Sequence, residues 1–130
     1  MVTTIAAVLS PLSVASAASA AYAQALVLKA LARSPWQPRR LPLAYPRCVI
    51  ETGGTSVASL YDEVFCQDLY RSPKPLPAAP RIVDAGGHLG MASLYFLFRY
   101  PNSRLTTLEP NPALAALLRR TLAPFGERAA

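Results

Sequence analysis

The first 50 residues of this 130-residue chain contain no aspartate or glutamate, although the whole chain has seven acidic residues. Five of the 13 basic residues lie in this acid-free part, at Lys29, Arg33, Arg39, Arg40 and Arg47. From Glu51 onward, eight basic residues face seven acidic ones, so that part is almost neutral. A nucleic-acid-binding domain carries its basic residues on the folded domain itself. The uneven charge therefore argues against nucleic acid as a partner.

Cysteine and histidine are scarce, with Cys48 and Cys66 as the two cysteines and His88 as the sole histidine. Disulfide scaffolds and structural metal sites need several cysteines or histidines at defined spacings. Cys48 and Cys66 show neither a metal-binding nor a redox spacing. We therefore expect two free thiols in a reducing, cytoplasmic compartment and no metal site.

Residues 1–28 lack any charged side chain. A membrane span needs about 20 strongly apolar residues, and serine, threonine and proline interrupt this stretch, so we expect no stable membrane span. Ala18-Ser19-Ala20 and Ala23-Gln24-Ala25 resemble small-residue cleavage sites, but a secretory signal begins with a positively charged region. Three interpretations stay open: a loose helical extension of the domain, a signal or transit peptide, and a start codon assigned too far upstream.

Glycine is also scarce, with six residues against 13 prolines. Proline removes backbone donors and breaks regular elements, which predicts irregular segments where prolines cluster, at 35–46 and 73–80. We accordingly divide the chain into an alanine- and proline-rich leader, 1–46, with a helix over 15–34, and the N-terminal part of a domain, 47–130. Four prolines separate the two parts, so we expect residues 1 to about 45 to be dispensable for the domain.

The domain begins with short elements. Residues 48–52 form a β-type run, and Ser56 is a suitable N-cap for a helix with apolar residues at helical spacing as far as Leu69.

A sharper pattern follows the second proline cluster. Residues 81–85 predict a strand, 86–89 a turn, 90–100 an almost wholly apolar helix, and 104–109 a second strand. Asn111 caps a last helix that begins at Pro112, whereas 124–130 show no strand pattern. Alternating strands and helices predict an α/β fold with a parallel sheet and a right-handed crossover.

The chemistry-bearing residues follow the first of these strands, in Val83-Asp84-Ala85-Gly86-Gly87-His88-Leu89-Gly90, and Glu109 ends the second strand. Such a turn suits a nucleoside ligand, because Gly86 removes a side chain that would collide and Gly90 lets a ligand approach the backbone. The helix N-terminus offers N–H groups to a carboxylate. Glu109 can accept two hydrogen bonds from a ribose diol.

A dinucleotide site fits this turn poorly. The G-x-G-x-x-G pattern would place Ala85 at its first glycine, and the carboxylate of Asp84 would repel a pyrophosphate. S-adenosylmethionine carries a sulfonium and an amine but no phosphate, so the spacing D-x-G-x-x-x-G favours a methyl donor. A dinucleotide-dependent oxidoreductase stays a distant third possibility.

Residues 81–122 resemble the first motifs of the FkbM-type methyltransferases, whose pattern is roughly V-D-x-G-A-N-x-G, a helix, and then x-E-P-x-P. The second motif here is Leu108-Glu109-Pro110-Asn111-Pro112, and residues 56–70 resemble the helix that precedes the family's first strand. Gly87 and His88 depart from the alanine and asparagine usual in the family.

The resemblance implies an incomplete Rossmann-like parallel sheet, the N-terminal portion of a class I methyltransferase fold. It implies S-adenosylmethionine as donor and O-methylation of a hydroxyl on a small molecule, saccharide or lipid. The predicted cofactor-binding residues are Asp84, Ala85, Gly86, Gly87, His88, Gly90, Glu109 and Asn111. No residue can be assigned to catalysis, and we interpret His88 as a loop-lining side chain. The alternative hypothesis is a non-catalytic nucleotide-binding or interaction fragment, since a complete fold needs more strands.

Overall fold

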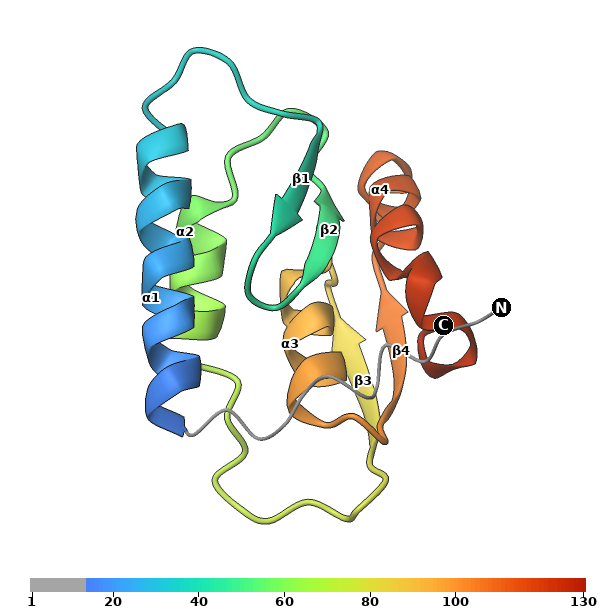
Figure 1. Ribbon diagram of the computed structural model, residues 1–130. Helices are drawn as coiled ribbons and strands as arrows, with labels where there is room; N and C mark the ends of the chain where they lie inside the picture. The colour runs from blue at the N-terminus through green and yellow to red at the C-terminus, as the bar shows by residue number, and fades with distance from the viewer. Residues whose placement is uncertain (1–13) are drawn as a thin grey trace, which may run out of the picture.

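The computed structural model describes residues 14–130, which form a mixed α/β structure with two small sheets (Figure 1). The elements are α1 (Val14–Leu31), β1 (Arg40–Leu43), β2 (Cys48–Glu51), α2 (Ala58–Tyr61), the π-helical turn η2 (Asp62–Cys66), β3 (Arg81–Ala85), α3 (Met91–Arg99), β4 (Arg104–Leu108), α4 (Pro112–Leu122) and the 3₁₀ turn η3 (Ala123–Arg128). No helix within 14–130 is long and apolar enough to cross a bilayer.

The predicted strand–helix–strand–helix unit is confirmed. β3 and β4 pair in parallel, with Ile82 opposite Leu105 and Asp84 opposite Thr107. Helix α3 connects the two strands and packs on the sheet face that carries Ile82 and Leu105. The opposite face is uncovered, since Val83 is 67% exposed and Leu108 is 55% exposed. Alternate residues of a strand point to opposite faces, so the sheet has one packed face and one open face.

The segment expected to be an irregular linker contains a strand. β1 pairs antiparallel with β2, with Leu41 opposite Ile50 and Leu43 opposite Cys48. Pro42 lies inside β1, which within residues 14–130 pairs with β2 alone, and proline is tolerated in such edge strands. The proline pattern was therefore misleading here.

The leader helix is also part of the core, which argues against the expectation that residues 1 to about 45 are dispensable. Ala25 and Leu28 of α1 and Leu43 of β1 are at most 3% exposed and belong to the same apolar cluster as Ile50 and Tyr61. The Ala44 N–H donates to Oε1 of Gln24 over 2.6 Å. The apolar core thus contains residues from both sides of residue 46, the predicted boundary between leader and domain. The interpretations that concern residues 1–13 lie outside the described residues.

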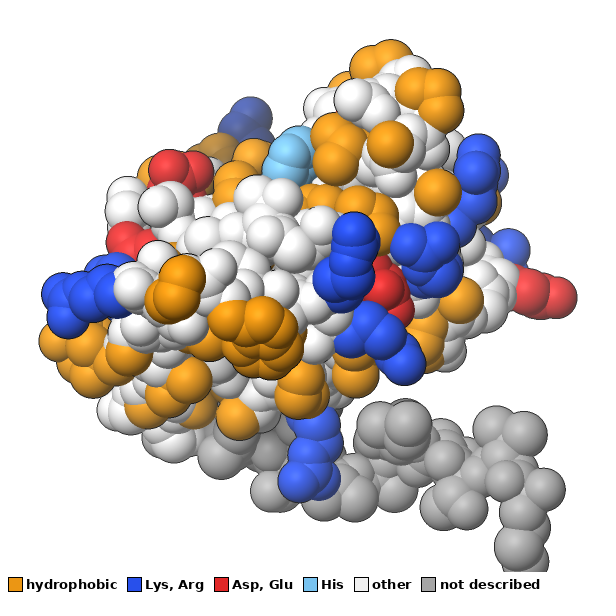
Figure 2. Space-filling model, turned by 90° about the horizontal axis from the view of Figure 1, so that it is seen from above, with side chains coloured by type: hydrophobic (Ala, Val, Ile, Leu, Met, Phe, Trp, Pro, Cys, Tyr) orange, Lys and Arg blue, Asp and Glu red, His pale blue; other side chains and the backbone are white. Residues whose placement is uncertain are grey.

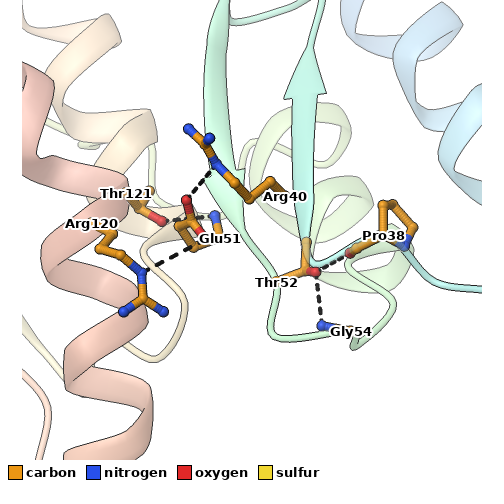
Figure 3. A network of polar contacts seen from close by, with 7 residues as sticks. All are labelled: Pro38, Arg40, Glu51, Thr52, Gly54, Arg120 and Thr121. Carbon is orange, nitrogen blue, oxygen red and sulfur yellow. Dashed lines mark hydrogen bonds and ion pairs between the residues drawn. The ribbon is translucent and has the colours of Figure 1, made fainter.

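Glu51 links the β1–β2 hairpin to α4 (Figure 3). Its carboxylate is 2.8 Å from Nε of Arg40 and 3.8 Å from Nε of Arg120, and its side chain is 11% exposed. Its backbone N–H donates to Oγ1 of Thr121 over 3.0 Å. Because removing one partner of a buried charge is unfavourable, this contact fixes the hairpin beside the parallel unit.

Two sequence predictions at element ends need correction. The helix predicted from Ser56 begins at Ala58, with Val57 as its N-cap and no side-chain cap bond. The C-terminal residues do make a β-contact, because Ala129 bridges Leu105 in parallel, and the Ala130 N–H donates to the Leu105 carbonyl over 2.9 Å. Strand pairing is made by backbone groups, so two alanines can pair without any strand pattern in their sequence.

Candidate functional site

The loop after β3 lies against the end of β4. The N–H groups of Gly86 and Gly87 both donate to the Leu108 carbonyl, over 2.8 and 3.0 Å. The Gly90 N–H closes the turn by donating to the Gly87 carbonyl over 2.8 Å. The carboxyl ends of the two parallel strands therefore meet at the predicted ligand-binding turn, which is the edge where open α/β sheets bind ligands.

Glu109 joins this loop to the start of α4. Its Oε2 accepts a hydrogen bond from the His88 N–H, and its Oε1 accepts one from the Asn111 N–H, each over 2.8 Å. The bond from Asn111, followed by the one from His88, lowers the pKa of Glu109 below its usual value of 4.5. An ionised carboxylate has about four acceptor positions, so this one retains acceptor capacity for a hydroxylated ligand.

The three loop glycines serve different purposes. Gly86 has φ 88°, and a Cβ placed there would meet nothing within 4 Å. The expectation that a side chain at Gly86 would collide is therefore wrong, and the glycine is favoured there by its left-handed backbone. Gly87 is the crowded position, because a Cβ would lie 2.1 Å from Cγ2 of Thr107. Gly90 combines φ 95° with a Cβ position 2.9 Å from Cδ1 of Leu118.

Asp84 is 9% exposed and lies beneath the loop rather than on its outer side. Its Oδ2 accepts a hydrogen bond from Oγ of Ser93 over 2.6 Å, and that hydroxyl is 2.9 Å from Oγ1 of Thr107. Sequence reasoning missed Ser93 and Thr107. The signal for Ser93 was present, since it is a small polar residue in an otherwise largely apolar helix.

The other predicted site residues in the loop and at the start of α4 are exposed. Ala85, Gly86 and His88 are exposed along the outside of the turn, and His88 also has a left-handed φ of 51°. Asn111 is exposed, and its Oδ1 accepts hydrogen bonds from the N–H groups of Ala113 and Leu114, which confirms it as the N-cap of α4. Its acceptor oxygen is therefore already engaged.

Two further features border the loop. Gly90 is the N-cap of α3, and no side-chain hydrogen bond caps this helix N-terminus. A groove begins at Glu109 and runs between the end of β4, helix α4 and the C-terminal residues. Its lining includes Leu108, Pro110, Leu118, Arg119, Leu122 and Ala130. The carboxyl edge of the β3–β4 sheet thus combines the carboxylate of Glu109, the N-terminus of α3 and the apolar side chains of the groove.

Comparison with known proteins gives partial matches. The chain is 39% identical over 64 residues to methyltransferase sdnD of Sordaria araneosa, covering 49% of this chain and 24% of that protein. It is 36% identical over 66 residues to methyltransferase 1 of Beauveria bassiana, covering 51% and 26%. A match of 35% over 71 residues to the AMB antimetabolite synthetase AmbE of Pseudomonas aeruginosa covers 54% of this chain and 3% of that protein.

The matched region spans about a quarter of the length of the two methyltransferases. No family model matches the chain, and no solved structure matches it. The similarity to proteins named methyltransferases supports a methyltransferase family for this chain.

Proposed function

We propose that this chain carries the S-adenosylmethionine-binding part of a methyltransferase of the FkbM type, within a partial Rossmann-like fold. The observation that carries the proposal is the meeting of the Gly86–Gly90 turn with Glu109 at the carboxyl end of the parallel sheet. The similarity to two proteins named methyltransferases supports the same activity.

The residues present suit that cofactor. Glu109 is anionic and partly exposed, and it would accept hydrogen bonds from the ribose hydroxyls. The uncapped first turn of α3 would hold the cofactor's carboxylate. The open space beside Gly86 leaves the backbone accessible to a ligand. The cofactor would supply an electrophilic methyl group on its sulfonium.

Asp84, Gly87 and Gly90 have a supporting role in this proposal. All three are buried, so they shape the turn from below. Ala85, Gly86 and His88 form its exposed side and are the loop residues we place nearest the cofactor. This division refines the set of eight residues proposed from the sequence.

The methyl acceptor we propose is a hydroxyl group of a small molecule, saccharide or lipid, in a cytoplasmic enzyme. Transfer of a methyl group requires an aligned nucleophile and often a base. The described residues carry no assigned base, so we place acceptor recognition in further parts of a complete enzyme.

Calorimetric titration tests the cofactor. The chain should bind S-adenosylmethionine or S-adenosylhomocysteine, and Glu109→Gln should weaken binding by about 1–3 kcal/mol because charged hydrogen bonds to the ribose are lost. Glu63→Gln is the matched control, since Glu63 is an exposed glutamate on η2 outside the site. Equal affinity of the wild-type and Glu109→Gln proteins would remove Glu109 from the site, and binding of a nicotinamide dinucleotide instead would favour an oxidoreductase.

A non-catalytic nucleotide-binding or interaction fragment is the second candidate. It is favoured by the short match, because the chain corresponds to about a quarter of the two methyltransferases. The same titration followed by an assay with a panel of acceptors tests whether this chain catalyses methyl transfer. Cofactor binding without methyl transfer fits both the second candidate and a partial enzyme. Turnover by these 130 residues would establish catalysis and require a base within them.

A further inference from the structure

One face of the molecule combines arginines with an exposed tryptophan. The connection between α1 and β1 forms the top of the molecule in Figure 1, and Figure 2 views it from that side. Basic side chains gather there around a single acidic one, with hydrophobic groups beside them (Figure 2). We call this surface the arginine face and define it by Trp36, Arg39, Arg40, Arg119 and Arg120.

The arginine face holds an excess of positive charge. All four arginines are exposed. Arg40 and Arg120 share the carboxylate of Glu51, whose side chain is 11% exposed and therefore contributes little negative surface. Arg39 and Arg119 form no ion pair within residues 14–130. Four guanidinium groups against one shared carboxylate leave the face strongly positive.

Trp36 is presented outward from a fixed turn. Its side chain is 68% exposed, and its backbone N–H donates to Oγ of Ser34 over 3.2 Å. The next residue, Gln37, ties the turn to the end of α1 by donating to the Leu31 and Ser34 carbonyls. An exposed indole held in this way has no role in the core of the protein.

Helix α1 carries further exposed apolar side chains. Tyr22, Leu26 and Val27 are between 50% and 62% exposed, on the side of α1 that faces away from the core residues Ala25 and Leu28. Lys29 lies on the same helix but is paired with Asp62 at 3.0 Å. An exposed tryptophan beside a cluster of arginines is typical of surfaces that lie in the membrane interface.

We propose that the arginine face binds a membrane surface rich in anionic lipids, with Trp36 inserted at the level of the headgroups. Arginines near such a surface are attracted by its negative potential, and tryptophan favours the interface between headgroups and acyl chains. Single-stranded nucleic acid is recognised by several stacked aromatic residues, whereas Trp36 is the one aromatic residue among the five that define the arginine face. A second copy of the chain would bring like charges together. The inference does not depend on methyl transfer.

Trp36 is the chain's single tryptophan, so its fluorescence reports on this face alone. The full chain is mixed with vesicles of phosphatidylcholine, with or without phosphatidylglycerol. We expect emission to shift to shorter wavelength with the anionic vesicles, not with neutral ones, and to return at about 1 M salt, where the Debye length falls to about 3 Å.

Two charge-matched variants locate the binding surface. The double variant with Arg39→Gln and Arg119→Gln removes two charges without breaking an ion pair. Its partitioning into anionic vesicles should be about 10- to 30-fold weaker than that of the wild type. The control pair Arg81→Gln and Arg104→Gln removes the same charge at the opposite, amino end of the parallel sheet, where the two residues lie side by side. It should leave partitioning within about threefold, because charges beyond a Debye length are screened. Circular dichroism and thermal melting establish that both variants fold.

Three results would overturn the proposal. Equal weakening in the two variants would mean that net charge alone drives binding. Vesicle binding in a flotation assay without any shift in Trp36 emission would place another face on the membrane. Binding of a single-stranded RNA that depends on Arg39 and Arg119, in the absence of vesicle binding, would assign the arginine face to nucleic acid.

Discussion

The carboxylate of Glu109 and the backbone of His88 are joined across the sheet edge, with the His88 N–H donating to Oε2 over 2.8 Å. The two residues come from different strand ends, so this bond closes the loop after β3 onto the residue after β4. His88 has a left-handed φ of 51°, a conformation that costs free energy in residues other than glycine. Glu109 therefore helps to hold the loop as well as offering acceptors to a ligand.

Protonation of Glu109 at low pH should weaken its hydrogen bond to the loop after β3. The pKa of Glu109 lies below its usual value of 4.5, because the carboxylate accepts hydrogen bonds from Asn111 and His88. A group whose pKa is lowered by folding stabilises the protein above its unfolded pKa and loses that effect as the pH falls through its folded pKa. The difference in melting temperature between the wild type and Glu109→Gln should be constant from pH 8 to about 5 and vanish at lower pH. A difference that grows on acidification would contradict this assignment.

The side chain of Thr107 fills the space beside Gly87 that a Cβ at position 87 would need. Because a Cβ at position 87 would lie 2.1 Å from Cγ2 of Thr107, Gly87→Ala should lower the free energy of unfolding by about 1–3 kcal/mol. Thr107→Ser removes that methyl group and keeps the hydroxyl that faces Ser93. Denaturant unfolding of the single and double variants should show that the serine recovers at least half of the loss. Additive losses would mean that the two positions are not in contact.

At Gly86, backbone conformation and not lack of space should limit substitution. Its Cβ position is open, but its φ of 88° is unfavourable for branched side chains. Gly86→Asn should keep most of the affinity for S-adenosylmethionine, because asparagine tolerates positive φ. Gly86→Val should abolish binding while leaving the far-UV circular dichroism spectrum largely intact. Calorimetric titration measures both variants, and full affinity in the valine variant would mean that the loop does not touch the ligand.

A chain that begins at Arg47 should fail to fold. It lacks β1, the partner of β2, and it loses the buried residues Ala25, Leu28 and Leu43. Burial of one leucine side chain stabilises a protein by about 1.5–3 kcal/mol, so the loss is comparable to the stability of a small domain. Thermal melting should show no cooperative transition, whereas a chain that begins at Val14 should melt sharply. A cooperative transition in the shorter chain would restore the leader as a dispensable segment.

The parallel unit was predictable because its signals are local. Asn111 and Pro112 specify a helix start, and the apolar run before Gly86 specifies a strand. The predicted bounds of β3 agree with the structure, and those of β4 differ by one residue. The sequence was enough to predict that Glu109 lies beside the glycine turn. Each follows one of two parallel strands, and the carboxyl ends of such strands meet at the same edge of the sheet.

The features that sequence reasoning missed depend on contacts between distant residues. β1 exists because its backbone pairs with β2, and the prolines around it obscured any local strand signal. The interaction of Asp84 with Ser93 links residues on a strand and on a helix and has no sequence pattern of its own. The role of Gly87, likewise, is set by a methyl group 20 residues away, on Thr107.

The open face of the β3–β4 sheet has a consequence for the protein's behaviour in concentrated solution. Val83 and Leu108 present apolar surface there, while the molecule as a whole carries a net charge of +6. At low ionic strength this charge keeps molecules apart, and added salt shortens the range of the repulsion. The short-range attraction between two sheet faces should then dominate, so we expect the second virial coefficient to change from positive to negative as salt is raised. We therefore expect the protein to be colloidally stable in dilute buffer and to self-associate as salt is added.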